Sequence, residues 1–303
     1  GRAHGIMTTV HSSLCMPYIL HYGTEAQKQH YLPAAISGAC ILGICMTEPG
    51  TGSDLANIQT KALRDGDHYV INGSKTFISL GQLAGAFIVV AKTDPAANPP
   101  HKGISLLLVD ADTPGVVKGR KLEKLGLAAQ DTSEIFFQDA RVPASALLGQ
   151  EGQGFKMLMT QLQQERVCIG VGAVASCRRA LDDTMEYVKQ RRAFGQPIAA
   201  FQNTQFKLAE LWSQVEIGQC FVDNLLAAHV RHEDVVSEVS AAKWWTTDLQ
   251  KRLTAECLQL HGGYGFMLEY PIAMDFADAA VQSIYAGTNE IMKTIIAKRL
   301  GLG

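Results

Sequence analysis

Apolar residues change their spacing along the chain twice, and these changes divide it into three parts. In the first part, residues 1 to about 35, they recur at roughly helical intervals. The first stripe consists of Ile6, Val10, Leu14 and Ile19. A second helix is expected over TEAQKQHYLPAA, with Thr24 as its N-cap. This part of the chain is therefore predicted to be helical.

The second part, from about residue 38 to 150, contains short β-rich runs that alternate with Gly, Pro, Asn and Asp. The runs are CILGICM, HYVINGSKTFIS, AFIVVAK, GISLLLVD and SEIFFQDARV. Asn72-Gly73 lies between HYVI and SKTFI and predicts a two-residue hairpin turn. Strands at this spacing, with no helix between them, predict a small antiparallel barrel or sandwich.

The third part, from about residue 151, keeps a helical pattern to the end of the chain. Its periodic segments cover residues 153–193, 202–232, 236–261 and 288–301, and Gly195-Gln196-Pro197 and His261-Gly262-Gly263 mark helix ends. Long helices joined by short loops predict an up-and-down bundle of about four helices. The expected fold class is therefore α+β, with helices first, a β domain in the middle and a helix bundle last.

The composition excludes several classes of protein. Of the 303 residues 47% are hydrophobic and 18% are charged, and the net charge of −2 provides no basic field for nucleic acid. The longest apolar runs are too short to span a bilayer. The seven cysteines form no CxxC pair, and the nine histidines lack HxxxH or HExxH spacing. We expect reduced core cysteines in an intracellular protein, and no metal site.

Glu165 is a carboxylate on a helical stripe that is otherwise apolar. Leu158, Leu162 and Ile169 share the stripe, at spacings that bring side chains onto one face of a helix. Burial of a carboxylate disfavours its charged form and raises its pKa. Such a base can remove a weakly acidic C–H proton near neutral pH. The alternative is a solvated Glu at the rim of the stripe, paired with a nearby Arg, since most helical Glu residues are solvated.

Two segments of the middle part have features of a ligand site. Met46–Asp54 has two closely spaced glycines and several hydrogen-bonding side chains, so its backbone can approach a flat ligand closely. Phe77 and Ser79 lie on one face of a predicted strand, where they can stack on a ring and donate a hydrogen bond. A tight turn and ordinary strand packing are the respective alternatives. Neither segment is a phosphate loop or a Rossmann motif.

Three segments of the helical part have similar features. Lys189–Gly195 contains an arginine that could bind a phosphate, with Phe194 next to it. The alternative is that these cations only interact favourably with the dipole at a helix C-terminus. Gln259–Gly265 has more glycines than a helix end requires, which favours close approach of the backbone to a ligand. In Tyr285–Ile291, Thr288 is a candidate N-cap, and the free N–H groups of the helix that follows form an anion or carbonyl site.

These motifs together, in their order along the chain, resemble the acyl-CoA dehydrogenase family. The matching segments are MTEPGTGSDL, NGSKTFIS, QDTSEIFFQDARVP, QER, KQRRAFG, LQLHGGYGF and YAGTNEIMKTIIAKRLG, and the similarity is closest to the long-chain branch. The resemblance implies a remnant of an N-terminal helical domain over residues 1–36, a middle antiparallel β domain over 37–150 and a C-terminal four-helix bundle over 151–303. Family members carry further helices before the point where this sequence starts.

The resemblance also implies site residues for FAD and acyl-CoA. Those expected at FAD within one subunit are Met46, Thr47, Gly52, Ser53, Phe77, Ile78, Ser79, Thr288, Asn289 and Glu290. Those expected at the FAD of a neighbouring subunit are Arg191, Phe194, Gln202, Gln259, Leu260, His261, Gly262 and Gly263. Those expected near acyl-CoA are Ser53, Gln163, Arg166, Ala286 and Gly287.

The position of the catalytic base departs from that of many family members. They carry it directly after the tyrosine of the YxGT motif, where this chain has Ala286, whereas the long-chain and isovaleryl branches carry it at the position of Glu165. The implied reaction converts a long-chain or branched acyl-CoA to trans-2-enoyl-CoA in fatty acid β-oxidation. Glu165 takes the α-proton, a hydride passes from the β-carbon to FAD, and the Ala286 N–H holds the thioester carbonyl.

The resemblance further implies a homotetramer that passes electrons to electron-transfer flavoprotein, in the bacterial cytoplasm or the mitochondrial matrix. Neither a nucleic acid nor stable membrane insertion is expected. Two alternatives remain at this point. One is an acyl-CoA oxidase that uses oxygen, and the other is a non-catalytic truncated subunit that serves as an assembly partner.

Overall fold

The computed structural model describes residues 8–302, so Ile6 of the predicted first stripe lies outside the described residues. The chain divides into two compact units, Gly1–Lys124 with Ala128–Gln164, and Leu125–Leu127 with Glu165–Gly303. The boundaries of the three domains expected from the sequence stay a prediction.

The first unit begins with helices, as predicted. A π-helix, Thr9–Cys15, continues into α2, Met16–Tyr22, and α3 follows at Glu25–Ser37. Thr24 caps α3 through a reciprocal pair of hydrogen bonds with Gln27, in which each backbone N–H donates to the other side chain at 2.9 and 3.2 Å. The predicted cap is therefore confirmed.

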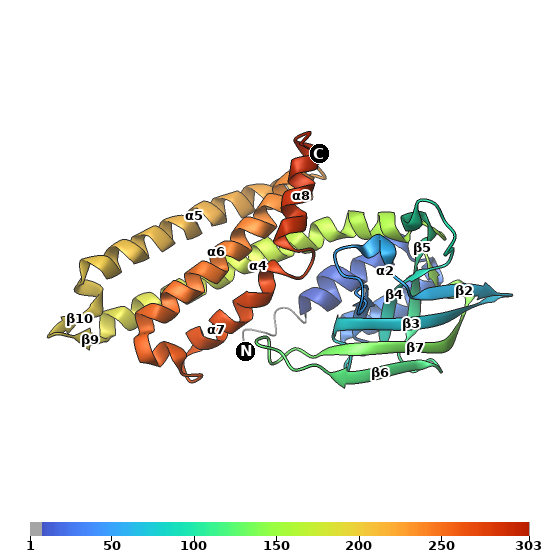
Figure 1. Cartoon of the computed structure of the whole chain (residues 1–303), viewed down its shortest axis with the longest axis horizontal. Helices are drawn as coiled ribbons and strands as arrows, with labels where there is room; N and C mark the ends of the chain where they lie inside the picture. The colour runs from blue at the N-terminus through green and yellow to red at the C-terminus, as the bar shows by residue number, and fades with distance from the viewer. Residues whose placement is uncertain (1–7, 303) are drawn as a thin grey trace. The chain divides into compact units, whose positions relative to one another are not determined.

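The strands of this unit form one eight-stranded sheet in the order β6-β7-β3-β2-β4-β5-β8, with β1 paired to β4 (Figure 1). Their bounds are β1 Leu42–Cys45, β2 Lys61–Asp65, β3 His68–Ser79, β4 Ala86–Lys92, β5 Ile104–Asp110, β6 Val116–Lys121, β7 Thr132–Pro143 and β8 Leu147–Leu148. Most pairs are antiparallel, but β1 and β2 lie parallel to β4. The predicted middle β domain is confirmed, and the sequence pattern missed β2, β6 and β8.

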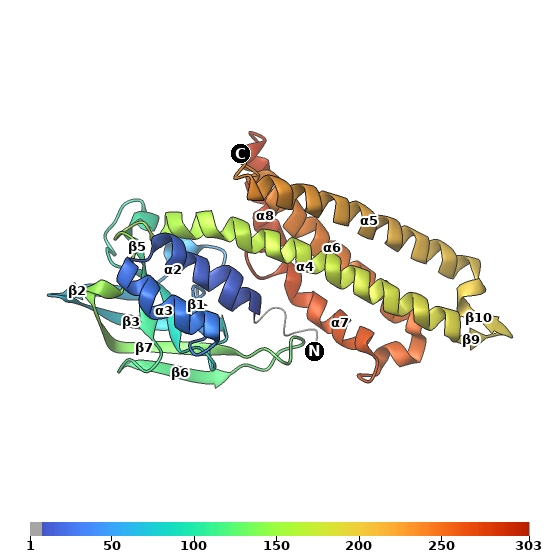
Figure 2. The ribbon, with the colours of Figure 1, turned by 180° about the vertical axis from the view of Figure 1, so that it is seen from behind.

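Strands β4 and β5 are buried on both of their faces. Ile88 and Val90 of β4 belong to a core with Leu14, Tyr18 and Ile19 of the helices, and Figure 2 shows these helices over the sheet. The alternate residues Phe87 and Val89 belong to a second core, which includes Tyr69, Ile71, Ile135 and Phe137 of β3 and β7. Burial on both faces explains why these two strands are continuous apolar runs.

The predicted hairpin turn at Asn72-Gly73 is wrong. Both residues lie inside β3, at a bulge opposite β7, and the two-residue turn between β2 and β3 is Gly66-Asp67. Gly73 is required there because a Cβ would lie 2.7 Å from the Cα of Thr60. The Asn72 side chain donates to and accepts from Asp139 at 2.9 Å. Gly73 thus allows the Thr60 backbone to lie close to β3, and Asn72 binds Asp139 of β7.

The helices of the C-terminal part are α4 Gly154–Gln190, α5 Gln202–Val230, α6 Val236–His261, α7 Pro271–Ala279 and α8 Asn289–Arg299. In the second unit, Cys177 and Leu181 of α4 pack with Leu211 of α5, Leu253 of α6 and Ile272 of α7. The predicted helical domain is confirmed, although α7 was missed and α4 ends at Gln190 instead of 193. Short strands β9, Arg192–Ala193, and β10, Gln196–Pro197, follow α4.

The composition also led to expectations about the cysteines, metal sites and membrane-spanning helices. Cys15, Cys45, Cys177 and Cys257 are buried, as predicted, whereas Cys220 is exposed. Within residues 8–302 there is no group of His, Cys, Asp and Glu side chains that could hold a metal ion. No helix in the same range has the length and apolar character needed to cross a membrane.

Candidate active site

One oxygen of the Glu165 carboxylate on α4 is buried without a hydrogen bond. This atom, Oε2, is inaccessible to solvent and has no partner among the described residues. Burial raises the pKa of Glu165 from 4.5 to about 7, although the nearby charges of Arg166 and Lys243 oppose the rise. The sequence-based expectation of a buried carboxylate with a raised pKa is therefore confirmed. A carboxylate of this kind can exchange a proton near neutral pH.

The segment 285–287 lies beside Glu165 in the second unit. Burial raises the pKa of Tyr285, and the charge of Glu165 raises it further. The Nε of Arg166 donates to the carbonyl oxygen of Ala286 at 3.3 Å, and the Nζ of Lys243 donates to that of Gly287 at 2.7 Å. Two cationic side chains thus bind two consecutive carbonyl groups of this segment.

The backbone of this segment is left-handed at both of its central residues. Ala286 has φ +53° and Gly287 has φ +90°, and a Cβ at Gly287 would lie 2.8 Å from the Cε of Met292. The Ala286 N–H makes no hydrogen bond to any of the residues that the structure describes. With its carbonyl oxygen bound and its N–H free, Ala286 can donate a hydrogen bond to a ligand.

Helix α8 begins directly after this segment. Thr288 is its N-cap, as predicted, because its Oγ1 accepts a hydrogen bond from the N–H of Ile291 at 3.3 Å. The pKa of Glu290 is lowered because its carboxylate accepts hydrogen bonds from the Glu290 backbone N–H and from the Thr288 side chain. Asn289 is only 2% exposed, and it donates to the carbonyl oxygen of Trp244 and to Asp248 on α6. The Asn289 side chain therefore fastens α8 to α6.

In the first unit, the loop after β1 lies beside the end of β3. The N–H of Thr76 donates to the carbonyl oxygen of Thr47 at 2.9 Å, and the Nζ of Lys75 donates to that of Met46 at 3.0 Å. The structure thus brings together two segments that the sequence associated with a flat ligand. Gly52 has no atom within 4 Å of where a Cβ would lie. Phe77 is 66% exposed and has φ +58°, a sparsely populated conformation for an aromatic residue.

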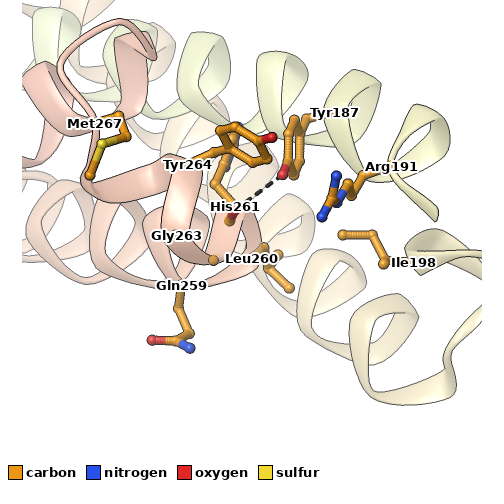
Figure 3. A pocket seen from close by; sticks show the side chains of 10 residues that line it. Tyr187, Arg191, Ile198, Gln259, Leu260, His261, Gly263, Tyr264 and Met267 are labelled. Carbon is orange, nitrogen blue, oxygen red and sulfur yellow. Dashed lines mark hydrogen bonds between the residues drawn. The ribbon is translucent and has the colours of Figure 1, made fainter. Parts of the chain in front are cut away.

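A pocket of about 440 Å³ brings together Arg191 and the Gln259–Gly263 segment in the second unit (Figure 3). Tyr187 lines the pocket beside His261: its ring stacks on that of His261 at 4.1 Å between centroids, and its hydroxyl donates to the His261 carbonyl oxygen. The guanidinium of Arg191 lies 5.3 Å from the centroid of the Tyr264 ring. The other residues that line this pocket are Ile198, Tyr264 and Met267.

Two other predicted residues lie outside the lining of this pocket. Phe194 is 95% exposed at the turn between β9 and β10, where it and Gly195 have φ +50° and +84°. Gln202 is the exposed first residue of α5.

Sequence reasoning missed two buried lysines that organise these sites. Lys75 is separated from Tyr69 and Ile71, two buried residues of β3, by an even number of positions, so the alternation of the strand predicts that it faces the same side. Lys243 lies four residues after Val239, on the buried face of α6. The signal that identified Glu165, a charge on a buried stripe, was present in both cases.

The chain matches known proteins over nearly its whole length. Models of the acyl-CoA dehydrogenase N-terminal, middle and C-terminal domains match residues 1–39, 43–140 and 152–301. A long-chain specific acyl-CoA dehydrogenase, mitochondrial, from Sus scrofa is 49% identical over 96% of this chain and 68% of its own. The crystal structure of an acyl-CoA dehydrogenase from Geobacillus kaustophilus is 54% identical, with a TM-score of 0.96 over 97% of this chain and 78% of that one. The structure titled "PigA with FAD and proline" is 28% identical, with a TM-score of 0.95 over 99% and 78%.

The described residues suit FAD in three places. The exposed ring of Phe77 and the open backbone at Gly52 provide a surface for a flat ring system. The N-terminus of α8, where the helix dipole is positive, favours a pyrophosphate. Arg191, beside the glycines of the pocket, provides a charged donor next to accessible backbone.

Proposed function

The chain belongs to the acyl-CoA dehydrogenase family of FAD-dependent oxidoreductases, and on that premise we propose that it oxidises long-chain or branched acyl-CoA with Glu165 as the base. The substrate is an acyl-CoA thioester, and the proposed product is the trans-2-enoyl-CoA. The observation that carries the proposal is the buried Oε2 of Glu165, which has no partner among the described residues.

The α-proton of a thioester is too weakly acidic for an unassisted carboxylate. Glu165 has a pKa of about 7, so it is a stronger base than an exposed glutamate and is still substantially ionised at neutral pH. The free Ala286 N–H supports a second role, in which it holds the thioester carbonyl and stabilises the negative charge that develops when the proton leaves. Since Ala286 itself has no acidic side chain, the base must come from another element.

FAD, when bound, supplies the acceptor for the hydride that leaves the β-carbon. The residues proposed to hold it within a subunit are Met46, Thr47, Gly52, Ser53, Phe77, Ile78, Ser79, Thr288 and Glu290, and Asn289 fixes the helix that carries the last two. Arg191, Gln202 and the Gln259–Gly263 segment are proposed to reach the FAD of a neighbouring subunit. Gln163 and Arg166 are proposed to lie near acyl-CoA, and Arg166 also fixes the Ala286 carbonyl.

The preference for a long chain is supported by similarity to the long-chain enzyme of Sus scrofa. The small residues after Glu165 on α4 do not add to this support. A Cβ at Gly170 would lie 3.6 Å from the Cβ of Ala242 on α6, Ala173 is buried, and Gly172 is exposed. Helix packing is therefore sufficient to explain Gly170 and Ala173. We assign electron-transfer flavoprotein as the electron acceptor and a homotetramer as the assembly on family resemblance alone.

Replacement of Glu165 by Gln tests the base. The variant keeps the shape of the side chain and should retain FAD, but reduction of the flavin by palmitoyl-CoA should slow by about 10²–10⁴-fold. The matched control is Glu186→Gln, an exposed glutamate on the same helix that pairs with Lys189. Bleaching of the flavin absorption at the wild-type rate in Glu165→Gln would contradict the assignment.

Two further measurements test the substrate and the acceptor. Flavin bleaching across short, long and branched acyl-CoAs should be fastest with long or branched chains, and a maximum with butyryl-CoA would contradict the preference. The enzyme should reduce purified electron-transfer flavoprotein and release little hydrogen peroxide in air. Rapid peroxide formation without that protein would instead indicate an oxidase.

A further inference from the structure

Lys243 places a charged group inside the second unit, beside Glu165 and the Ala286–Gly287 segment. Its side chain is 0% exposed on α6. Its Nζ donates to the carbonyl oxygen of Gly287 at 2.7 Å and to the Oδ1 of Asn289 at 2.9 Å. A buried ammonium is expensive to desolvate, and an apolar side chain would fill the same space without that cost. The position of this lysine therefore calls for a role beyond packing.

We propose that Lys243 is a positioning residue for the reaction, which fixes the Ala286–Gly287 segment and stabilises the ionised carboxylate of Glu165. The proposal rests on the function proposed above, since it assigns Lys243 to the support of the same base and the same N–H donor. Lys243 itself is not proposed to touch the substrate.

The first half of the proposal follows from the hydrogen bonds. Ala286 and Gly287 both have positive φ and belong to no helix or strand, so side chains must hold them. Arg166 holds the first carbonyl group and Lys243 the second. Lys243 also binds Asn289, which is bonded in turn to Trp244 and Asp248 of α6. Without the ammonium, the Gly287 carbonyl and the Asn289 amide oxygen would lose a charge-assisted donor.

The second half follows from the charges that surround Glu165. Arg166 on α4 and Lys243 on α6 both favour its ionised form, while Tyr285 faces it as a neutral hydroxyl. Burial and the charge of Arg166 lower the pKa of Lys243 to about 8, and Asp248, Glu165 and Glu290 oppose this change. Lys243 is therefore still mainly charged at pH 7. Removal of its charge should raise the pKa of Glu165 above its present value of about 7.

Two substitutions of Lys243 separate the hydrogen bonds from the charge. Lys243→Gln keeps a neutral donor, on a side chain one bond shorter, but removes the charge, and Lys243→Met removes both. Flavin reduction by palmitoyl-CoA is measured on the full-length, FAD-loaded variants as a function of pH. In Lys243→Gln the acidic limb of the pH–rate profile should shift to higher pH by about half a unit or more. The limiting rate should fall by about tenfold or less. In Lys243→Met the limb should move similarly and the limiting rate should fall about 100-fold, because the N–H donor is displaced as well.

The control is Lys251→Met, two turns further along α6, where the exposed lysine donates to Ser283. It should leave both the rate and the pH profile unchanged. An unmoved acidic limb with a wild-type rate in both Lys243 variants would overturn the proposal. Failure of both variants to fold or load FAD would do the same, because it would make Lys243 a purely structural residue. If Glu165→Gln reacts at the wild-type rate, the proposed function itself fails. If Glu165→Gln is inactive but both Lys243 variants behave like the wild-type enzyme, only the inference about Lys243 is rejected.

Discussion

The carboxylate of Glu48 and the ammonium of Lys75 lie 2.9 Å apart, with side chains that are 5% and 0% exposed. Glu48 comes from the loop after β1, and Lys75 from β3. Burial raises the pKa of Glu48, but Lys75 and the N–H groups of Thr60 and Gln59 outweigh this effect and hold the pKa below its ordinary value. The ion pair therefore keeps the proposed flavin-facing loop against the strand that carries Phe77 and Ser79.

Breaking this pair should destabilise the first unit and weaken FAD binding. Glu48→Gln leaves Lys75 as an uncompensated buried charge, which costs about 3–5 kcal/mol. Because the folded-state pKa of Glu48 is lowered, its contribution is present above the ordinary pKa of a glutamate and is lost as the pH falls through the lowered value. Urea unfolding at pH 7 and the ratio of flavin to protein after purification measure the two effects.

The double variant Glu48→Gln/Lys75→Met should recover part of the lost stability, because no unpaired charge remains, but it should not recover FAD binding. Asp65→Asn is the control, since Asp65 pairs with Arg141 at an exposed site. Exposed pairs contribute roughly 0–1 kcal/mol. A Glu48→Gln variant as stable as the control would contradict the role assigned to the pair.

Glu165 should make the protein less stable at alkaline pH than a neutral residue would. A rise of its pKa from 4.5 to about 7 corresponds to roughly 3 kcal/mol. The raised value means that folding favours the protonated form, so the penalty is absent below pH 4.5, grows between 4.5 and about 7, and is complete above. Glu165→Gln should therefore raise the free energy of unfolding at pH 8 but leave it nearly unchanged at pH 4.5. Equal effects at both pH values would show that the carboxylate is not desolvated in solution.

Much of the fold was predictable because the core follows simple patterns. Strands β4 and β5 are continuous apolar runs because both faces are buried, and the long helices repeat their apolar positions over many turns. The bulge at Asn72-Gly73 was not predictable in this way, since it depends on the approach of Thr60, which directly precedes β2. Helix α7 has only nine residues, too few for a clear period.

The candidate site was predictable where one residue contradicted its surroundings. Glu165 interrupts an apolar stripe, and Ala286 occupies the position at which many family members carry the base. Lys75 and Lys243 were missed because a lysine in the sequence is expected to be solvated, and only the tertiary structure shows the carbonyl and carboxylate groups that bind it. Tyr187 was missed for a related reason, since its stacking on His261 joins two helices distant in sequence.

A carboxylate at position 286 should restore part of the activity of a variant without Glu165. Ala286 has φ +53°, a conformation that a glutamate can adopt at a cost similar to that of alanine. Palmitoyl-CoA should reduce Glu165→Ala/Ala286→Glu faster than it reduces Glu165→Ala, as measured by flavin bleaching. The control is Glu165→Ala/Ala286→Gln, which has the same size but no base. Equal rates in the two double variants would show that position 286 does not face the substrate carbon.

The pocket around Arg191 should complete the FAD site of a second subunit. Arg191→Gln should weaken FAD binding about tenfold or more, the value of one charge-assisted hydrogen bond. Arg192→Gln is the control, because that side chain donates to the Gly195 carbonyl oxygen within the hairpin. Phe77→Ala should also weaken binding, through loss of the exposed ring.

Mixing these two defective variants distinguishes a shared site from one built by a single chain. If each FAD contacts Phe77 of one subunit and Arg191 of another, a mixed pair of subunits contains one site in which both residues are intact. Unfolding and refolding an equal mixture of Arg191→Gln and Phe77→Ala should then restore about a quarter of the wild-type flavin content, since random pairing makes half the pairs mixed. Flavin absorption after removal of free FAD measures this recovery. A flavin content no higher than that of either variant alone would place Arg191 and Phe77 at the FAD of the same chain, or show that one of them does not contact it.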